Sequence, residues 1–232
     1  MKKRILLASI FLIAVFIACN KDSDSSIPET SSEVNVFVAV PGLTADVVID
    51  TTTIANGLEM GESTGYHSFL AKRYNLSIFR TGNRTSPIVS GQISLRNNHS
   101  YSVFLSLDHT DALRVLAVED NLAQPAMGYS KIRIIDLSDT YNSQAENVLL
   151  DFHIYTTDTI RYRNIGYMAA TEFTQIPFNT YKRDIFYADS SLSFLGNNAP
   201  TVTFEDRKIY SWIVYGNAQV KDSFKLVEFK HN

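Results

Sequence analysis

The side chains of this chain that could do chemistry are its histidines, its cysteine and its carboxylates, and their spacing does not indicate a reaction. None of the histidines falls at the short spacings of a metal site or of an HExxH helix: His67, His99, His109, His153 and His231. The chain also lacks a GxSxG elbow, a glycine-rich phosphate loop and a cysteine nucleophile. We therefore expect no enzyme, no catalytic residue, no cofactor and no metal ion.

The carboxylates lead to the same expectation. Asp46 with Asp50 could be imagined as a glycosidase pair, but such a pair needs a set separation across a cleft, and the sequence indicates no cleft. We expect Asp46 to stabilise a strand entry or a turn instead. Asp136 and Asp139 are only weak calcium candidates, because an EF-hand pattern is missing.

Cys19 is the only cysteine, and its setting indicates lipid attachment. A basic start precedes an apolar stretch from Ile5 to Ile17, and the small Ala18 comes directly before Cys19. The four residues FIAC resemble a bacterial lipobox. The stretch is shorter than the roughly 20 residues of a membrane-spanning helix, which favours cleavage. We expect a signal peptide over residues 1–18 and a lipid on Cys19; an ordinary buried cysteine is the alternative.

The residues after Cys19 are polar and indicate a tether over residues 19–32. The segment NKDSDSS, from Asn20 to Ser26, resembles the surface-export signal of lipoproteins in Bacteroidetes-type bacteria. A plain solvated tether would have the same composition. We expect an outer-membrane lipoprotein that is anchored through Cys19 and lies on the cell surface, with the periplasmic face as the alternative.

Composition excludes some partners. Removal of Lys2, Lys3 and Arg4 with the signal peptide lowers the 21 basic residues to 18, against 24 acidic residues. The mature chain is therefore acidic and lacks the basic surface of a nucleic-acid binder. Because the lipid occupies the only thiol, no disulfide can stabilise the fold, and apolar burial must do so.

The chain contains an internal repeat. Residues 57–79 (GLEMGESTGYHSFLAKRYNLSIF) align without a gap with residues 164–186 (NIGYMAATEFTQIPFNTYKRDIF). Matched apolar positions continue on both sides, with insertions only between apolar runs, as surface loops tolerate. We expect two copies of one domain, over residues 33–124 and 131–232, joined by a linker over residues 125–130.

Each copy has the pattern of β-strands. The valines at positions 34, 36, 38 and 40 recur with the period of two of a strand that buries one face, and turn-like segments separate several similar runs. Tyr101 and Tyr210 each follow a hydrophobic residue and a polar corner, which is typical of the tyrosine corner of Ig-like sandwiches. We expect an all-β fold with two tandem Ig-like antiparallel β-sandwiches, in which both tyrosines are buried and Trp212 belongs to the core.

Both copies resemble the bacterial domain-of-unknown-function family 4397, an extracytoplasmic Ig-like module that commonly occurs in tandem. The resemblance rests on VNVFVAVPGLTADVV (Val34 to Val48), GLEMGESTGY (Gly57 to Tyr66) and the junction from Asp120 to Ser138. It implies fold and location, and it brings no established activity. Arg183 stands where the first copy has Leu76. Because an inward arginine would need a partner, we expect a bulge or an exposed strand face there.

Tyrosine is concentrated in the second copy, which makes this copy the candidate for a binding surface. Tyrosine offers broad contact area and a polar tip at low entropy cost. The candidate surface consists of Tyr155, Arg161, Tyr162, Arg163 and Tyr167. On a strand the two arginines would share one face, while the tyrosine between them would point the other way. Plain β-propensity is the competing explanation.

The sequence thus favours a non-enzymatic envelope lipoprotein that acts as an adhesion or ligand-binding module, with a glycan or another envelope protein as its partner. A structural spacer is the alternative, and a glycan-processing enzyme comes third. A contiguous exposed aromatic patch would indicate a binder. Dispersed or individually buried tyrosines would indicate a spacer.

Overall fold

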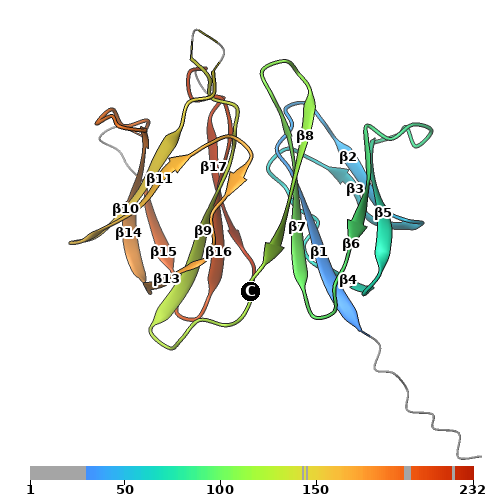
Figure 1. The fold of residues 1–232 in the computed structure, drawn as a ribbon, viewed down its shortest axis with the longest axis horizontal. Helices are drawn as coiled ribbons and strands as arrows, with labels where there is room; N and C mark the ends of the chain where they lie inside the picture. Colours follow the sequence, from blue (N-terminus) through green and yellow to red (C-terminus); the bar gives the residue numbers. More distant parts are fainter. Residues whose placement is uncertain (1–29, 143, 145, 196–199, 221–222) are drawn as a thin grey trace, which may run out of the picture.

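A computed structural model describes residues 30–142, 144, 146–195, 200–220 and 223–232 of the chain. The expected signal peptide, Cys19 and the tether through residue 29 lie outside these residues. The described part consists of strands and loops (Figure 1), so the expectation of an all-β fold is confirmed. It contains no helix with the length and apolar character needed to cross a bilayer.

The first eight strands form two four-stranded sheets that pack face to face, here called the first sandwich. The strand order is β4-β1-β7-β8 in one sheet and β3-β2-β5-β6 in the other. The strands are β1 (Ser31–Val38), β2 (Ala45–Ile49), β3 (Thr52–Leu58), β4 (His67–Leu70), β5 (Arg73–Arg80), β6 (Val89–Ser94), β7 (Ser100–Leu107) and β8 (Leu113–Asp120).

The remaining strands form the second sandwich in the same way. Its sheets have the orders β12-β9-β16-β17, with β13 also paired to β9, and β11-β10-β14-β15. The strands are β9 (Tyr129–Ser138), β10 (Leu150–Tyr155), β11 (Thr159–Ile165), β12 (Ala169–Ala170), β13 (Thr174–Pro177), β14 (Asn179–Tyr187), β15 (Thr201–Phe204), β16 (Ile209–Gly216) and β17 (Lys225–Lys230).

The two sandwiches have the same pattern of strand pairing. Each also contains one parallel pair of strands, which departs from the expected antiparallel order. β1 lies parallel to β7, with Val34 opposite Tyr101, and β9 lies parallel to β16, with Ile132 opposite Tyr210. Alternate apolar residues of facing sheets fill a separate core in each sandwich. Trp212 is 1% exposed in the second core, as its position in the sequence predicts.

The prediction for Arg183 is wrong, because its side chain is buried rather than exposed. The guanidinium group lies 5.6 Å from the centre of the Trp212 ring and forms an ion pair with Glu228. The arginine therefore has the partner that an inward charge requires. Burial lowers the pKa of Arg183 to about 10.

The tyrosine corners are only partly as predicted. Tyr210 is buried, and its hydroxyl accepts a hydrogen bond of 3.2 Å from the backbone N–H of Glu205, as the prediction requires. Tyr101 is half-buried, and its hydroxyl accepts a bond of 3.2 Å from the side chain of Arg96 instead. The difference arises because the first copy has Arg96, whose side chain donates hydrogen bonds, at the position equivalent to Glu205.

Asp46 has the structural role that we expected. Its carboxylate accepts hydrogen bonds from the backbone N–H of Gly57 (3.0 Å), from Thr81 (2.8 Å) and from Arg84 (3.1 Å). Burial acts to raise the pKa of this carboxyl group, but these three donors outweigh it and lower the pKa. Asp46 thus joins β2 to β3 and to the β5–β6 loop.

Candidate ligand-binding site

The two sandwiches pack through the outer faces of one sheet each, β4-β1-β7-β8 and β12-β9-β16-β17, which face each other in Figure 1. The first sandwich contributes Phe37 and Phe104, and the second contributes Ile135 and Ile213; all four are at most 2% exposed. Burial of such large apolar side chains stabilises the contact by about 1.5–3 kcal/mol each. The junction therefore holds the two sandwiches as one body.

Asp120, the last residue of β8, connects the two sandwiches through a buried ion pair. One of its carboxylate oxygens lies 2.6 Å from Nη2 of Arg133 in β9, and neither side chain is more than 2% exposed. The other oxygen accepts hydrogen bonds from the hydroxyl groups of Tyr66 (2.6 Å) and Ser102 (2.7 Å). One oxygen thus faces the arginine charge and the other accepts two hydrogen bonds.

His231 closes this network into a ring of hydrogen bonds. Nε of Arg133 donates to the hydroxyl of Ser211 (2.8 Å), which lies 2.8 Å from Nε2 of His231. Nδ1 of the histidine lies 2.7 Å from the hydroxyl of Tyr66, which donates to Asp120. A consistent direction around the ring assigns the proton of a neutral imidazole to Nδ1.

Electrostatics support this assignment. Burial, and then the charge of Arg133, lower the pKa of His231 to about 3. Burial and the neighbouring Asp120 raise the pKa of Tyr66 above its ordinary value. At neutral pH the ring therefore contains one anion and one cation, with neutral groups between them.

The network is built on positions that the two copies share. The strand registers and the repeat give each of these residues an equivalent in the other copy. Where the first copy has an amide or an acid the second has a basic residue, while one position is serine in both copies. The equivalent pairs are Asn35 and Arg133, Tyr66 and Phe173, Ser102 and Ser211, and Asp120 and His231. Complementarity between the sandwiches thus arises from divergence at equivalent sites.

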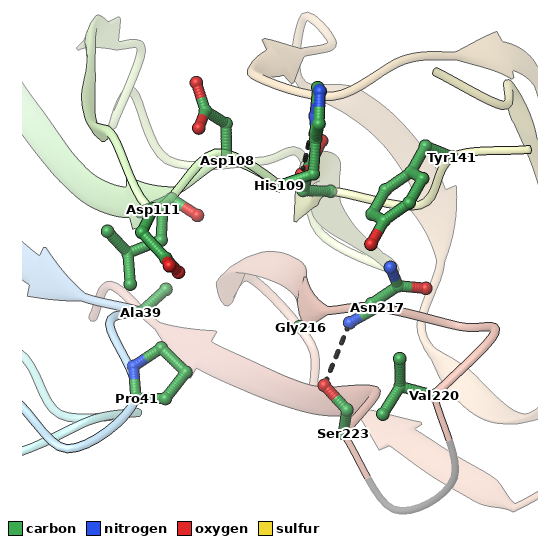
Figure 2. A pocket seen from close by; sticks show the side chains of 13 residues that line it. Ala39, Pro41, Asp108, His109, Asp111, Tyr141, Gly216, Asn217, Val220 and Ser223 are labelled. Carbon is green, nitrogen blue, oxygen red and sulfur yellow. Dashed lines mark hydrogen bonds and ion pairs between the residues drawn. The ribbon is translucent and has the colours of Figure 1, made fainter. Parts of the chain in front are cut away.

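A pocket of about 250 Å³ opens at one end of this junction (Figure 2). Four segments form its walls. They are the loop after β1 with residues 39 and 41, the β7–β8 hairpin around residues 108–111, the loop after β9 with residues 139 and 141, and residues 216, 217, 220 and 223 at the end of β16 and after it. The pocket exists only because the apolar contact beneath it holds the two sandwiches together. Pockets at such domain junctions are common ligand sites.

A histidine and an aspartate from different sandwiches meet in this pocket. The Asp139 side chain, 8% exposed, accepts a bond of 2.9 Å from the Asn147 amide and lies 3.2 Å from Nδ1 of His109. The His109 ring packs against Tyr141, with the ring centres 5.0 Å apart. Asp139 thereby orients the imidazole.

The remaining polar groups of the pocket divide into those that build it and those that face its space. Asp108 builds the hairpin: it accepts bonds from Thr110 and from the backbone N–H of Ala112, and it pairs with Arg114. The hydrogen bond from the Thr110 hydroxyl is the main reason that the pKa of Asp108 is lowered. Figure 2 shows Asp111 and Tyr141 on opposite sides of the pocket.

This set of groups suits binding better than reaction. The two serine hydroxyls of the pocket already have partners within the protein: Ser106 donates to the Leu137 carbonyl (3.0 Å) and Ser223 accepts from the Asn217 N–H (3.2 Å). Neither is placed beside His109 as a nucleophile would be. Within the described residues, no group of three or more His, Cys, Asp or Glu side chains is placed to hold a metal ion.

The tyrosines and arginines predicted as one surface lie in different environments. Tyr162 packs against the core of the second sandwich, and burial raises its pKa to about 12. Tyr167 lies near Ser106 of the first sandwich, and burial raises its pKa to about 12 as well. These two side chains therefore belong to the interior and to the junction, respectively.

The other three predicted residues are accessible but separated. Arg161 and Arg163 are exposed on β11. Tyr155, at the end of β10, lines a separate open pocket of about 350 Å³ with Thr180 and Lys182. The structure thus does not bring Tyr155, Tyr162 and Tyr167 into one contiguous patch.

The interpretation of the sequence missed the junction pocket. Its groups come from four segments of the two sandwiches, which only the contact between the sandwiches brings together. One local signal was present: the residues DHTD at 108–111 place a histidine between two aspartates in a turn between alternating strands. That signal predicts a polar hairpin, but it does not indicate what the hairpin faces.

Comparison with solved structures finds distant likenesses. The TIE protein of Bacillus anthracis is 10% identical with a TM-score of 0.24; the match covers 81% of this chain and 34% of that chain, so this chain spans about a third of its length. CBMbc, a family CBM26 protein from Eubacterium rectale Amy13K in complex with maltoheptaose, is 9% identical with a TM-score of 0.24, covering 86% of this chain and 96% of that one. No curated protein sequence matches the chain.

A family comparison is more specific. Residues 32–145 match the family described as "Domain of unknown function (DUF4397)". The matched segment includes the strands of the first sandwich, the connection to the second and β9, and so contains both Asp120 and Arg133. Residues 32–145 of the chain therefore belong to the DUF4397 family.

Proposed function

We propose that this chain is a non-enzymatic, lipid-anchored envelope protein that binds a small hydroxylated ligand, such as a sugar unit of a glycan, in the junction pocket. The observation that supports it is the convergence of His109, Asp111 and Tyr141 around a space of about 250 Å³. Hydroxyl groups donate and accept hydrogen bonds, so they match a carboxylate, an oriented imidazole and a phenol. The tyrosine ring adds an apolar face.

The proposal includes the expected organisation of the chain. A signal peptide over residues 1–18 is removed, residues 19–32 form the tether, and Cys19 bears the lipid. The domains span residues 33–124 and 131–232, with a linker at 125–130. Protease treatment of intact cells, with a Cys19→Ala variant for comparison, tests the location. Digestion only after lysis would contradict the cell-surface part of this proposal.

The binding site is tested by a glycan-array screen of the mature protein, followed by calorimetry with the best ligand. We expect Tyr141→Ala and His109→Ala each to weaken binding about tenfold or more. Tyr155→Ala is the matched control, because it removes a tyrosine from a different pocket of the second sandwich. Loss of binding in Tyr155→Ala but not in Tyr141→Ala would move the site to the surface around Tyr155.

A structural spacer is the second candidate, and two observations favour it. The predicted tyrosines are separated, and the Asp120–Arg133 pair ties the sandwiches together, as a rigid spacer would need. A spacer would show no saturable ligand binding in the array. It would still give solution scattering that fits one fixed arrangement of the two sandwiches.

A further inference from the structure

The first sandwich is open along the edge where β6 and β8 lie opposite each other. An apolar groove of about 210 Å³ lies between the two sheets there. Its floor is formed by the core residues Leu76 and Val103, and its wall on β8 is formed by Val115 and Ala117. Val115 is 45% exposed although it faces the space between the sheets. The groove therefore leaves apolar surface of the core accessible to solvent.

A glycine on β6 is one cause of this opening. Gly91 lies opposite Leu76 in the β5–β6 ladder, between the inward-facing positions of Val89 and Ile93. A side chain at this position would point into the groove, and a Cβ atom placed on Gly91 would have no heavy atom within 4 Å. Its φ angle is not in the left-handed region, so the backbone does not require glycine here.

The second sandwich shows what fills the same place. There the repeat and the strand registers put Arg183 at the place of Leu76, Trp212 at that of Val103 and Glu228 at that of Ala117. The Arg183–Glu228 ion pair and the indole ring beneath it cover that core. The first sandwich has a smaller residue at each of these places, so an apolar volume of side-chain size is left unfilled.

The edge strand beside the groove is unprotected. Among the described residues, β6 pairs only with β5, so one row of its backbone groups is free. Its sequence, VSGQIS, contains neither a charge nor a proline, the features that usually prevent pairing at an edge. The equivalent edge strand of the second sandwich, β15, has four residues and directly follows Pro200. A six-residue edge without such protection can accept a further strand.

We propose that β6 is a docking site for an extended segment of another protein, which pairs with the free edge and inserts alternate bulky apolar side chains into the groove. A strand beside β6 would extend its sheet and lie opposite β8. Its inward side chains would then cover Val115 and Ala117, as Trp212 and its neighbours cover the second core. This surface is separate from the junction pocket, so it goes beyond the function proposed above.

The sequence and the register favour a foreign segment over the two internal candidates. The tether from Asn20 to Glu29 has a single bulky apolar residue, Ile27, and cannot supply alternate ones. A second copy that paired through its own β6 would present Gly91 at the centre of its inward face, and the groove would stay empty. The segment that fits carries an aromatic or a large aliphatic residue at its centre, between residues that need not be charged.

The test uses the mature protein and a synthetic peptide of about seven residues, in which phenylalanine, tryptophan and valine alternate with threonine. The control peptide has the same composition, with its apolar residues adjacent rather than alternating. We expect the alternating peptide alone to bind in calorimetry and to protect the amide hydrogens of β6 from exchange. Absence of binding, or equal binding of the two peptides, would overturn the proposal.

Two variants of β6 sharpen the test without disturbing the core. Gly91→Leu fills the groove from within, so we expect it to weaken peptide binding about tenfold or more and to leave the protein folded. Ser90→Leu adds the same side chain on the outer face of the same strand, and we expect it to retain binding. If Gly91→Leu leaves binding unchanged, the groove is not the site. If Gly91→Leu instead abolishes a concentration-dependent dimer that forms without peptide, a second copy is the occupant and the assignment to another protein is wrong.

Discussion

Asp120 and Arg133 lie on opposite sides of the junction and form an ion pair of 2.6 Å in which neither side chain is more than 2% exposed. Replacement of Asp120 by alanine leaves the arginine charge buried without a counter-charge. We expect Asp120→Ala to lower the free energy of unfolding by about 3–5 kcal/mol, measured by urea denaturation.

The matched control is Glu119→Ala, one residue earlier on the same strand. Glu119 pairs with Arg96, but both side chains of this pair are largely exposed. Such a pair contributes about 0–1 kcal/mol. A loss in Glu119→Ala as large as that in Asp120→Ala would contradict the role of burial in this prediction.

Two buried groups should give the stability of the protein opposite dependences on pH. His231 has a pKa of about 3 in the folded chain against about 6.5 for an exposed histidine, so its contribution to stability is lost as the pH falls through this range. Burial raises the pKa of Asp136 from 3.8 to about 7, so the contribution of Asp136 is lost as the pH rises through that range. The two effects largely cancel between about pH 4 and pH 6.

Variants separate the two effects. In Asp136→Asn only the effect of His231 remains. We expect the free energy of unfolding of this variant, relative to that of the unmodified protein, to fall by about 1.4 kcal/mol for each pH unit from about pH 6 to pH 4. In His231→Gln the relative stability should change in the opposite direction. Urea denaturation at several pH values measures both slopes. Parallel curves for the two variants would refute the assignment.

Gly61 makes a close contact across the junction that leaves no room for a Cβ atom unless the Tyr215 side chain shifts. Its φ angle is 89°, and a Cβ atom at this position would lie 2.7 Å from the hydroxyl oxygen of Tyr215 in the second sandwich. We expect Gly61→Ala to destabilise the protein by more than the roughly 1–2 kcal/mol of the backbone strain alone. Thermal unfolding measures this loss.

Gly65→Ala provides the comparison, because Gly65 has a φ angle of 70° and open space around its Cβ position. It should show the backbone strain without the clash. Addition of Tyr215→Phe to Gly61→Ala should recover part of the stability, since it removes the nearest atom. An additive double variant would show that the contact is unimportant.

The two corner tyrosines should differ in what their hydroxyl groups contribute. Tyr210→Phe leaves the backbone N–H of Glu205 without its partner, and we expect a loss of about 1–2 kcal/mol. Tyr101→Phe removes a bond to the exposed Arg96 and should cost at most about 0.5 kcal/mol. Urea denaturation of both variants measures the difference, and a reversed order would contradict the structural comparison.

Much of the fold could be predicted from the sequence, because it depends on local alternation and on the repeat. The alignment of Leu58 with Ile165 and of Tyr74 with Tyr181 requires equivalent strands in both copies, and the paired ladders agree with it. Tyr210 and Trp212 could be placed in the core because their neighbours define an inward face. The partner of Arg183 could not, since Glu228 reaches it from another sheet.

The junction could not be predicted in the same way, since its residues occupy the strand faces that usually meet solvent. A signal did exist in Val36-Phe37-Val38 and in Ile134-Ile135, where apolar residues continue without alternation and indicate strands buried on both faces. The sequence does not say which surface covers the second face. Tyr162 was misleading for the opposite reason, because an amphipathic ring serves a core as readily as a binding surface.

The shared junction face also limits how large an assembly of these modules can become. Had the copies joined head to tail, each end would still offer an unused face, and a longer chain could add modules without limit. Here the two copies bury the same face against each other, so neither copy has that face left for a third module. In the lipid-anchored arrangement proposed above, a greater distance from the membrane would therefore depend on the length of the tether and not on further sandwiches joined through this face.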